Sequence, residues 1–288
     1  MPKETPVRTS TESEVAAKRF GDERAVRMLA EAGFDCYDYS MFTVKRGQSL
    51  RSHRYLINAE KLRRAADDCG IACNQSHAPF PSLKPGNARY NRAVFTLLIR
   101  ALETTAALGG SVCVIHPVSL PEHTLETNLE LYNRLLPYAR DCNVKIALEN
   151  MWTWPEGSPT AGPGACATPE SFLSHLGALD PGRFTACLDI GHAEMAGTGS
   201  SAVELIRALG PRLGALHVHD NDLLHDSHTL PYMGLIQWPA VLQALGDIGY
   251  AGDFTLEADA FLYRVPDELM PQALRLMSET ARWMAGKI

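Results

Sequence analysis

The sequence has no long apolar run and no excess of basic charge, and both absences limit what the protein can be. Crossing a bilayer takes about 18–20 consecutive apolar residues, and no stretch of the 288 residues provides them. The first residues, Met-Pro-Lys-Glu-Thr, lack the apolar segment of a secretion signal, so we expect a cytoplasmic protein without a membrane partner. Lys and Arg number 27 against 33 Asp and Glu, a net charge of −6. The Lys and Arg residues are scattered, which disfavours nucleic acid as a partner because such binding depends on neutralised phosphates.

Two familiar motifs are also missing. The seven cysteines are odd in number and include no Cys-x-x-Cys pair, which argues against a disulfide scaffold. No Gly-x-Gly-x-x-Gly or Gly-Lys-Ser/Thr run is present, so the phosphate-binding loop of a doubly wound nucleotide-binding sheet is absent. What remains is the composition of an ordinary globular enzyme, 45% hydrophobic and 21% charged.

Short β-rich runs alternate with segments of helical periodicity along the whole chain. We predict strands at Val7–Thr9, Asp35–Tyr39, Ile71–Ser76, Ser111–His116, Lys145–Glu149, Phe184–Asp189, Leu213–His219 and Asp253–Glu257. We predict helices at Asp22–Ala32, Asn58–Cys69, Arg89–Leu108, Leu125–Asp141, Pro169–Leu176, Ala202–Leu209, Pro239–Ile248 and Pro266–Met284. Eight such units predict an α/β fold, a single (β/α)8 barrel that occupies residues 1–288 as one domain.

Polar side chains collect where the predicted strands end. In a parallel barrel these ends and the loops after them form the active-site face. The residues found there are His77, His116, Glu149, Asp189, His192, His217, His219, His225, Asp226, His228 and Glu257. Seven of the ten histidines belong to these few windows, although a histidine that ends one strand is more often a hydrogen-bonded structural residue.

Three carboxylates in this set predict a cation. Glu149, Asp189 and Glu257 each follow an apolar strand, so on a barrel they converge on one axis. Without a cation they would repel one another and raise one another's pKa values. A divalent metal that also takes an imidazole removes this conflict. Mixed oxygen and nitrogen ligands favour Mn²⁺, with Co²⁺, Zn²⁺ or Mg²⁺ as alternatives.

The set as a whole resembles the xylose isomerase-like TIM barrel superfamily. The matching positions are His77, His116, Glu149, Asp189-x-x-His192, His219-Asp-Asn-Asp222, Asp226-x-His228 and Glu257, in order along the chain. This superfamily includes sugar and sugar-phosphate isomerases and epimerases, ketose 3-epimerases, inosose dehydratases and nucleases of the endonuclease IV type. The motifs are specific for the superfamily and leave the substrate open.

The resemblance implies one divalent ion held by Glu149, Asp189, His219 and Glu257. His217 is the alternative histidine ligand, because residues two apart on a strand face the same side. The resemblance also implies that Glu149 and Glu257 exchange a proton α to a carbonyl through a metal-bound enediolate. His77, His116, His192 and His225 are candidate substrate contacts, and Trp152 is a candidate aromatic wall for a sugar ring. Asp226, His228 and His217 are candidates for a further metal or for substrate.

Three functions stay open at this point. The first is a metal-dependent sugar isomerase or epimerase acting on a small sugar or polyol-derived substrate, alone or as a homo-oligomer. The second is a lyase or dehydratase on a keto-sugar or keto-inositol, because two positions depart from the ketose 3-epimerase pattern. His225 stands where that branch has a substrate-binding Arg, and Pro155 where it has a second Glu. The third is a nuclease for abasic DNA, which would hold three metals with nine ligands and is disfavoured by the acidic charge. The nine are His77, His116, Glu149, Asp189, His192, His219, Asp226, His228 and Glu257.

Overall fold

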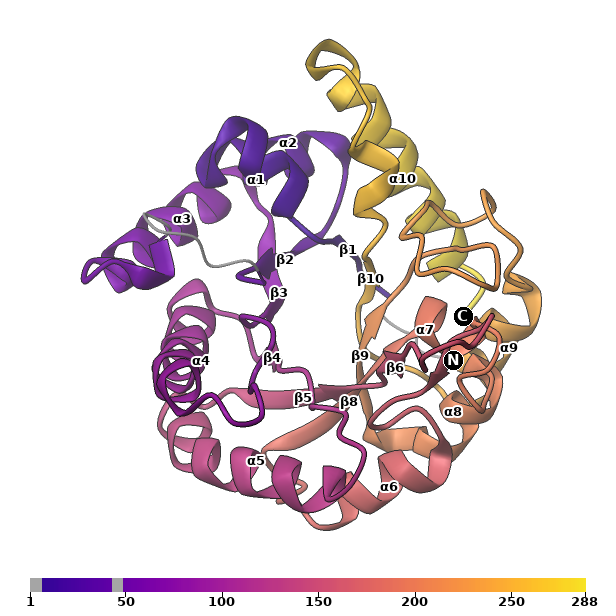
Figure 1. Cartoon of the computed structure of the whole chain (residues 1–288). Helices are drawn as coiled ribbons and strands as arrows, with labels where there is room; N and C mark the ends of the chain where they lie inside the picture. The colour runs from indigo at the N-terminus through magenta and orange to yellow at the C-terminus, as the bar shows by residue number, and fades with distance from the viewer. Residues whose placement is uncertain (1–6, 43–48) are drawn as a thin grey trace.

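Eight parallel strands form a closed ring in the computed structural model, which describes residues 7–42 and 49–288 (Figure 1). The ring consists of β1 (Thr9–Thr11), β2 (Cys36–Ser40), β3 (Ala72–His77), β4 (Val112–Val114), β5 (Lys145–Glu149), β8 (Phe184–Asp189), β9 (Leu213–His217) and β10 (Phe254–Leu256). Six of them, β2 to β9, pair in that order, and β1 pairs with β10. Parallel bridges between Glu12 and Asp38 and between Val218 and Leu256 join the two sheets. The predicted (β/α)8 barrel is therefore confirmed.

Helices surround the ring and follow each of its strands (Figure 1). The α-helices are α1 (Glu14–Phe20), α2 (Asp22–Ala32), α3 (Tyr55–Cys69), α4 (Ala88–Leu108), α5 (Thr124–Asp141), α6 (Pro169–Gly177), α7 (Ile190–Glu194), α8 (Ala202–Leu209), α9 (Trp238–Asp247) and α10 (Met270–Ala285). Short 3-10 turns lie at Ser49–Arg51, Gly210–Arg212, Asp259–Leu262 and Asp267–Leu269. No helix in the described ranges is long and apolar enough to span a membrane.

Several elements differ from the sequence prediction. The first strand is Thr9–Thr11, two residues later than predicted, because its register is set by pairing with Phe254–Leu256. The short helices α1 and α7 were not predicted, because seven and five residues hold too few turns to show a helical period. The loop after β5 contains an antiparallel hairpin of β6 (Trp152–Thr153) and β7 (Gly162–Pro163), which was predicted as loop.

The wall of the barrel divides the apolar core into two layers. The larger layer contains strand residues such as Ile146 and Leu148 together with the helical side chains outside the ring. Ala147 lies between these two in the chain and belongs to a separate inner cluster with Val114, Cys187 and Ala215. This alternation is what the two-residue repeat of a strand produces. The inner cluster is small, and polar side chains fill the ring on both sides of it.

Candidate active site

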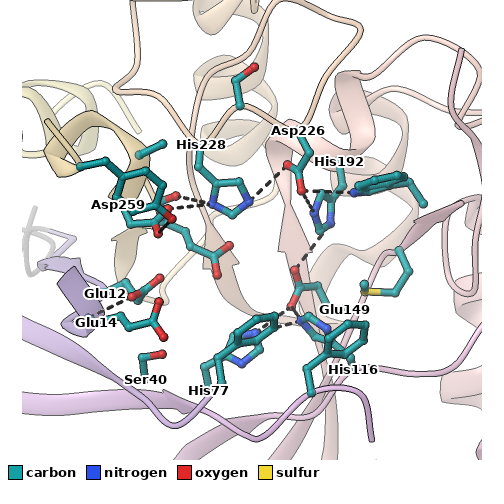
Figure 2. Close-up of a pocket in the computed structure, with 18 residues that line it drawn as sticks. Glu12, Glu14, Ser40, His77, His116, Glu149, His192, Asp226, His228 and Asp259 are labelled. Carbon is teal, nitrogen blue, oxygen red and sulfur yellow. Dashed lines mark hydrogen bonds and ion pairs between the residues drawn. The ribbon is translucent and has the colours of Figure 1, made fainter. Parts of the chain in front are cut away.

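The predicted polar residues meet in a cavity of about 480 Å³ at the C-terminal end of the strands (Figure 2). The predicted residues that line it are His77, His116, Glu149, Trp152, His192, Asp226, His228 and Glu257. Asp189, His217 and His219 are buried beside these lining residues, in contact with them. Only His225 of the predicted set lies away from the cavity. The strand ends therefore bring together the side chains that the sequence placed there.

His77 and His116 form one side of the site with Glu149. The two Nε2 atoms lie 2.8 Å apart, and His116 Nε2 lies 2.8 Å from Glu149 Oε2. Burial lowers the pKa of His116 to about 4, against an opposing effect of Glu149. The His116 imidazole is therefore neutral near pH 7, and one of its two nitrogens is available as an acceptor or a metal ligand.

The three predicted carboxylates lie together with His217. Ligand atoms of Glu149, Asp189, His217 and Glu257 are all within 4.8 Å of one another. His217 Nδ1 lies 3.3 Å from Glu149 Oε1 and 3.2 Å from Glu257 Oε2. Glu149 ends β5 and Asp189 ends β8, and these two strands are neighbours in the ring. His217 ends β9.

The two glutamates have opposite electrostatic environments. Burial acts to raise the pKa of Glu149, but His116 and His217 oppose it and hold that pKa well below the ordinary value. Burial raises the pKa of Glu257 well above its ordinary value, and Glu149 and Asp189 add to this while His217 and His228 oppose it. Two carboxyl groups whose pKa values are pushed apart are a common basis for acid and base roles at one site.

A series of buried polar contacts reaches His217 on the side away from the two glutamates. Its Nε2 lies 3.5 Å from Asp38 Oδ2 on β2, and Gln75 Nε2 of β3 donates to the same oxygen at 2.8 Å. All three side chains are buried. Both nitrogens of His217 therefore face carboxylates, with Asp38 on one side and the two glutamates on the other.

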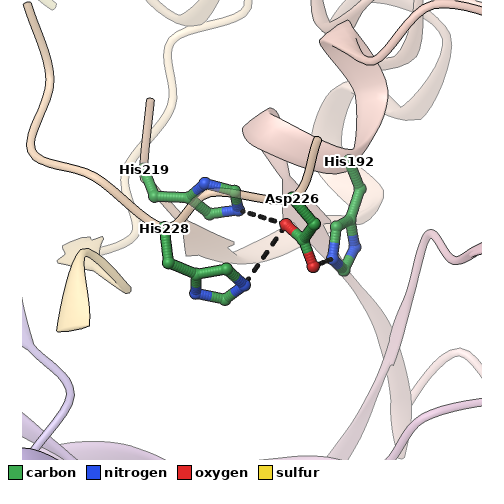
Figure 3. A group of neighbouring side chains, drawn as sticks. All are labelled: His192, His219, Asp226 and His228. Carbon is green, nitrogen blue, oxygen red and sulfur yellow. Dashed lines mark hydrogen bonds and ion pairs between the residues drawn. The ribbon is translucent and has the colours of Figure 1, made fainter. Parts of the chain in front are cut away.

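His219 faces a second group that contains His192, Asp226 and His228 (Figure 3). Asp226 lies at its centre, with Oδ1 3.2 Å from His228 Nε2 and 3.5 Å from His219 Nε2. The other oxygen, Oδ2, lies 3.3 Å from His192 Nε2. Burial alone would lower the pKa of His192, but Asp189 and Asp226 raise it to about 10.

His219 was predicted as the histidine ligand in preference to His217, and the two contact different carboxylates in the structure. Among the three carboxylates, His219 Nε2 contacts only Asp189, at 3.1 Å from Oδ1, and its ring stacks on His228. His217 contacts the other two carboxylates. Both side chains point into the barrel, so the compact group of four contains His217 where the prediction had His219. The packing around His219 is nevertheless tight, because a Cβ added to Gly191 would lie 1.9 Å from His219 Cε1.

Trp152 and His225 occupy different places at the mouth. Trp152 lines the cavity, and its Nε1 donates to Asp226 Oδ2 at 3.3 Å. His225 does not line it, which departs from its predicted role as a substrate contact. It is largely exposed, pairs with Asp222 at 2.8 Å and stacks on Trp154. The loop after β9 continues for several residues past the barrel end, and this carries His225 outward.

Sequence reasoning missed the opposite wall of the cavity. Glu12, Glu14 and Asp259 line it together with Ser40 and Tyr263 (Figure 2). Glu12 directly follows Thr11, the last residue of β1, and Glu14 comes two residues later as the first residue of α1. Because the first strand was predicted to end at Thr9, its polar C-terminal end was overlooked. A first strand placed at Thr9–Thr11 would have put Glu12 and Glu14 at its C-terminal end, among the candidate site residues.

The donor set suits a divalent cation. Several buried polar atoms in it have charged or polar neighbours nearby but make no hydrogen bond of good geometry: Glu149 Oε2, Asp189 Oδ2, both ring nitrogens of His217, His219 Nε2 and Asp226 Oδ1. Buried polar atoms that make no hydrogen bond are rare. Carboxylate oxygens and imidazole nitrogens are also the ligands that Mn²⁺ and Zn²⁺ accept together. The residues present therefore fit a metal.

Residues 26–285 match the sequence profile of the xylose isomerase-like TIM barrel family, so the chain belongs to this family. An uncharacterized protein of Methanocaldococcus jannaschii is 30% identical over 213 residues, which cover 70% of each chain. The predicted family is confirmed.

Solved structures similar to this chain include several sugar epimerases. A D-tagatose 3-epimerase-like protein is 26% identical, with a TM-score of 0.68 over 94% of this chain and 98% of the other. A D-allulose 3-epimerase from Methylomonas sp. is 17% identical, with a TM-score of 0.73 over the whole of both chains. A 3-keto-D-glucoside 4-epimerase from E. coli is 15% identical, with a TM-score of 0.70 over 95% of this chain and 99% of the other. At 17% and 15% identity, the last two similarities show a shared fold and nothing further.

Proposed function

We propose that the protein is a divalent-metal-dependent sugar isomerase or epimerase that moves a proton α to a carbonyl through an enediolate. The observation that carries this proposal is the pair Glu149 and Glu257. They are buried in one cavity, lie three strand positions apart in the ring, and have pKa values shifted in opposite directions. An exchange of one proton between two faces of a carbon needs one group that holds it and one that accepts it.

The proposed metal ligands are Glu149, Asp189, His219 and Glu257. A divalent cation there, Mn²⁺ by preference, would stabilise negative charge on the substrate oxygens. His217 then has a supporting role, because it contacts Glu149 and Glu257 and is itself held by Asp38. This arrangement follows the general pattern in which groups behind the ligands fix their orientation.

The remaining residues of the cavity suit a small polyhydroxy substrate. His116 and His77 are within reach of Glu149 and can bind substrate oxygens beside it. His192 is fixed by Asp226 Oδ2 and by a hydrogen bond between its Nδ1 and the Asn150 carbonyl at 2.9 Å. Trp152 and the stacked pair Phe42 and Phe80 provide apolar surface for carbon–hydrogen faces of a sugar. A lyase acting on a keto-sugar would share the same proton abstraction.

Solvent exchange tests this proposal. The Mn²⁺-loaded protein is incubated in D₂O with ketoses, keto-inositols and 3-keto-glycosides, and label α to the carbonyl is measured by NMR and mass spectrometry. At least one substrate class should incorporate label, and Glu257→Gln should abolish it. Glu156→Gln, an exposed change in the loop after β5, serves as the matched control. Labelled product without rearrangement would indicate an epimerase, and loss of a leaving group would indicate the lyase. Absence of label from every class would reject the proposal.

A further inference from the structure

The loop between β9 and α9 folds around one buried carboxylate, that of Asp220. Its Oδ1 accepts hydrogen bonds from the main-chain N–H groups of Asn221 at 2.9 Å and Ile236 at 3.1 Å. Its Oδ2 accepts from the main-chain N–H of Tyr232 at 2.9 Å and from the indole N–H of Trp238 at 2.8 Å. Asp220 is fully buried, and all four partners are donors, which matches the acceptor-only capacity of a carboxylate.

The main chain of Asp220 closes the part of this loop that reaches the active site. Its N–H donates to the carbonyl of Thr229 at 2.8 Å, and its carbonyl accepts from the N–H of Thr229 at 3.1 Å. Residues 221–228 therefore form a closed loop, and within it Asp226 and His228 line the cavity (Figure 2). One buried residue thus contacts both ends of the segment that supplies these two side chains.

The same loop has an unusual backbone that needs such support. Leu223, His228 and Tyr232 have φ angles of 65°, 43° and 72°, in the left-handed region that side-chain-bearing residues seldom adopt. Backbone of this kind persists only where the surrounding structure holds it. Two of the three donate to the anchoring side chains, because the N–H of Tyr232 bonds to Asp220 and that of Leu223 bonds to Asn221 Oδ1 at 2.8 Å.

Asn221 fixes the loop to the segment that carries His192. The Asn221 side chain is buried, and its Nδ2 donates to the carbonyl of Gly191 at 2.8 Å. Next to Gly191 in the chain, His192 directs its Nε2 to within 3.3 Å of Asp226 Oδ2 (Figure 3). Because Asp226 is carried by the loop alone, the conformation of the loop decides whether this contact forms.

We infer that Asp220 is a positioning residue for the active site, whose carboxylate holds residues 221–237 in the conformation that brings Asp226 and His228 into the cavity. Asp220 is fully buried, so it acts through these two residues and not on a substrate. Its effect on turnover rests on the proposed function, in which Asp226 fixes His192 beside the sugar. Its effect on the conformation of the loop is independent of any substrate.

Hydrogen exchange of the metal-loaded protein tests this role without a substrate. Asp220→Asn turns an NH₂ group toward two of the four N–H donors, and this group cannot accept from them. We expect the amides of residues 221–237 to exchange at least ~10-fold faster, as measured by mass spectrometry of peptides. Ser10→Ala removes a buried hydrogen bond to Asn74 between β1 and β3 and should leave this segment unchanged. Unchanged exchange in Asp220→Asn would overturn the inference.

A second variant displaces the carboxylate without altering it, and decides the question if Asp220→Asn does not fold. A Cβ added to Gly234 would lie 2.3 Å from Asp220 Oδ1 and 2.3 Å from the carbonyl oxygen of Asn221. Gly234→Ala must therefore shift the loop, and its amides should exchange at least ~3-fold faster. Gly177→Ala, which has open space around it, is the control. Normal exchange in Gly234→Ala would count against Asp220 as the anchor.

Turnover distinguishes positioning from a general loss of stability. For a sugar that takes up label in D₂O at saturating Mn²⁺, Asp220→Asn should raise KM at least ~10-fold and change kcat less than ~3-fold, because Glu149 and Glu257 follow other strands. Combined with Asp226→Asn, the same change should have little further effect, since Asp220 acts through that residue. Equal effects in both backgrounds, or a lower kcat with KM unchanged, would overturn the inference. If no sugar takes up label, the proposed function fails, and hydrogen exchange still decides the positioning role.

Discussion

At the scale of single residues, the site depends on how each side chain is held as well as on its chemical type. Glu149 and Glu257 are both buried carboxylates, yet their neighbours push their pKa values in opposite directions. Burial acts to raise the pKa of both, but at Glu149 the effects of His116 and His217 outweigh burial, whereas at Glu257 burial outweighs His217 and His228. The surroundings therefore favour the ionised form of Glu149 and the protonated form of Glu257.

Glu257→Gln separates the role of ligand from that of base. An amide keeps one oxygen for a metal but cannot accept a proton, so metal content should stay measurable while turnover falls at least ~100-fold, the usual scale for loss of a general base. Metal is measured by elemental analysis and turnover by label uptake in D₂O. Near-normal turnover with metal still bound would assign the proton transfer to a histidine, with His192 or His116 as the first candidates.

The roles of His217, which ends β9, and of His219, two residues later, can be distinguished in the same way. His219→Asn should lower the bound metal from about one ion per chain to a small fraction, because a four-ligand site loses a donor. His217→Asn should retain most of the metal and reduce turnover, because it removes a contact to Glu149 and Glu257. The reverse ranking in elemental analysis would make His217 the ligand and leave the three carboxylates in place.

Gly191 offers an indirect test of the same ligand. An added Cβ would lie 1.9 Å from the ring of His219, so Gly191→Ala must displace that ring. We expect metal affinity to fall at least ~10-fold, as is found when a supporting residue of a metal site is changed. Gly177→Ala at the end of α6 has open space around it and is the control. Unchanged metal affinity in Gly191→Ala would show that His219 is dispensable for the ion.

At the scale of elements, sequence reasoning predicted the strands that have an apolar pattern of their own and misplaced the one whose position depends on pairing. The strand β5 has a continuous apolar run before Glu149, and its predicted bounds agree with the structure. The strand β1 is only three residues long and contains Thr and Ser, so its own pattern says little. Its position is set by contacts with β10, which are distant in the sequence. That error hid Glu12 and Glu14, because their place in the cavity follows from where β1 ends.

The site shows the same division between local and distant information. Placement of Glu149, Asp189 and Glu257 at strand ends needed only the local pattern. The contacts of His217 with Asp38 on β2 depend on how strands close across the barrel, and no local signal carries them. His225 follows β9 in sequence, but the path of a long loop decides whether it reaches the cavity. The assignment of the catalytic and ligand roles stays a prediction, as does the single domain.

The closing strand also supports the stability of the barrel. Ser10 Oγ on β1 donates to Asn74 Oδ1 on β3 at 2.8 Å, and both residues are buried. Ser10→Ala leaves that amide oxygen without its donor, so the free energy of unfolding should fall by ~1–3 kcal/mol. Chemical denaturation measures this, with the exposed Thr96→Ala as a control that should change it by less than ~0.5 kcal/mol. Equal effects of the two changes would show that the Ser10–Asn74 bond contributes nothing.

At the scale of the whole molecule, charge is the property on which we base our preference for a sugar enzyme over a nuclease that would use the same ligands. The net charge is −6, and six carboxylates line the cavity. DNA binding depends largely on neutralising phosphates. The full nuclease-type ligand set is present, so the residues by themselves do not separate the two functions.

A duplex with one abasic site provides the corresponding test. We expect no metal-dependent strand cleavage with Mn²⁺ or Zn²⁺ and no tight duplex binding at low salt, because the chain has a net charge of −6 and duplex binding depends on neutralised phosphates. Gel electrophoresis and fluorescence anisotropy measure the two quantities, with a duplex lacking the abasic site as the control. Efficient incision at that site would reverse the ranking of the two functions.

The two-layer core has a consequence for how this family can diversify. The outer layer carries the packing between strands and helices, whereas the inner cluster is limited to Val114, Ala147, Cys187 and Ala215. Residues at the strand ends can therefore be exchanged over evolutionary time without disturbing the packing that holds the barrel closed. Structures with only 15–17% identity keep this architecture along nearly their whole length. New substrate preferences can arise in such a protein by changes at the rim of the barrel, while its scaffold is inherited unchanged.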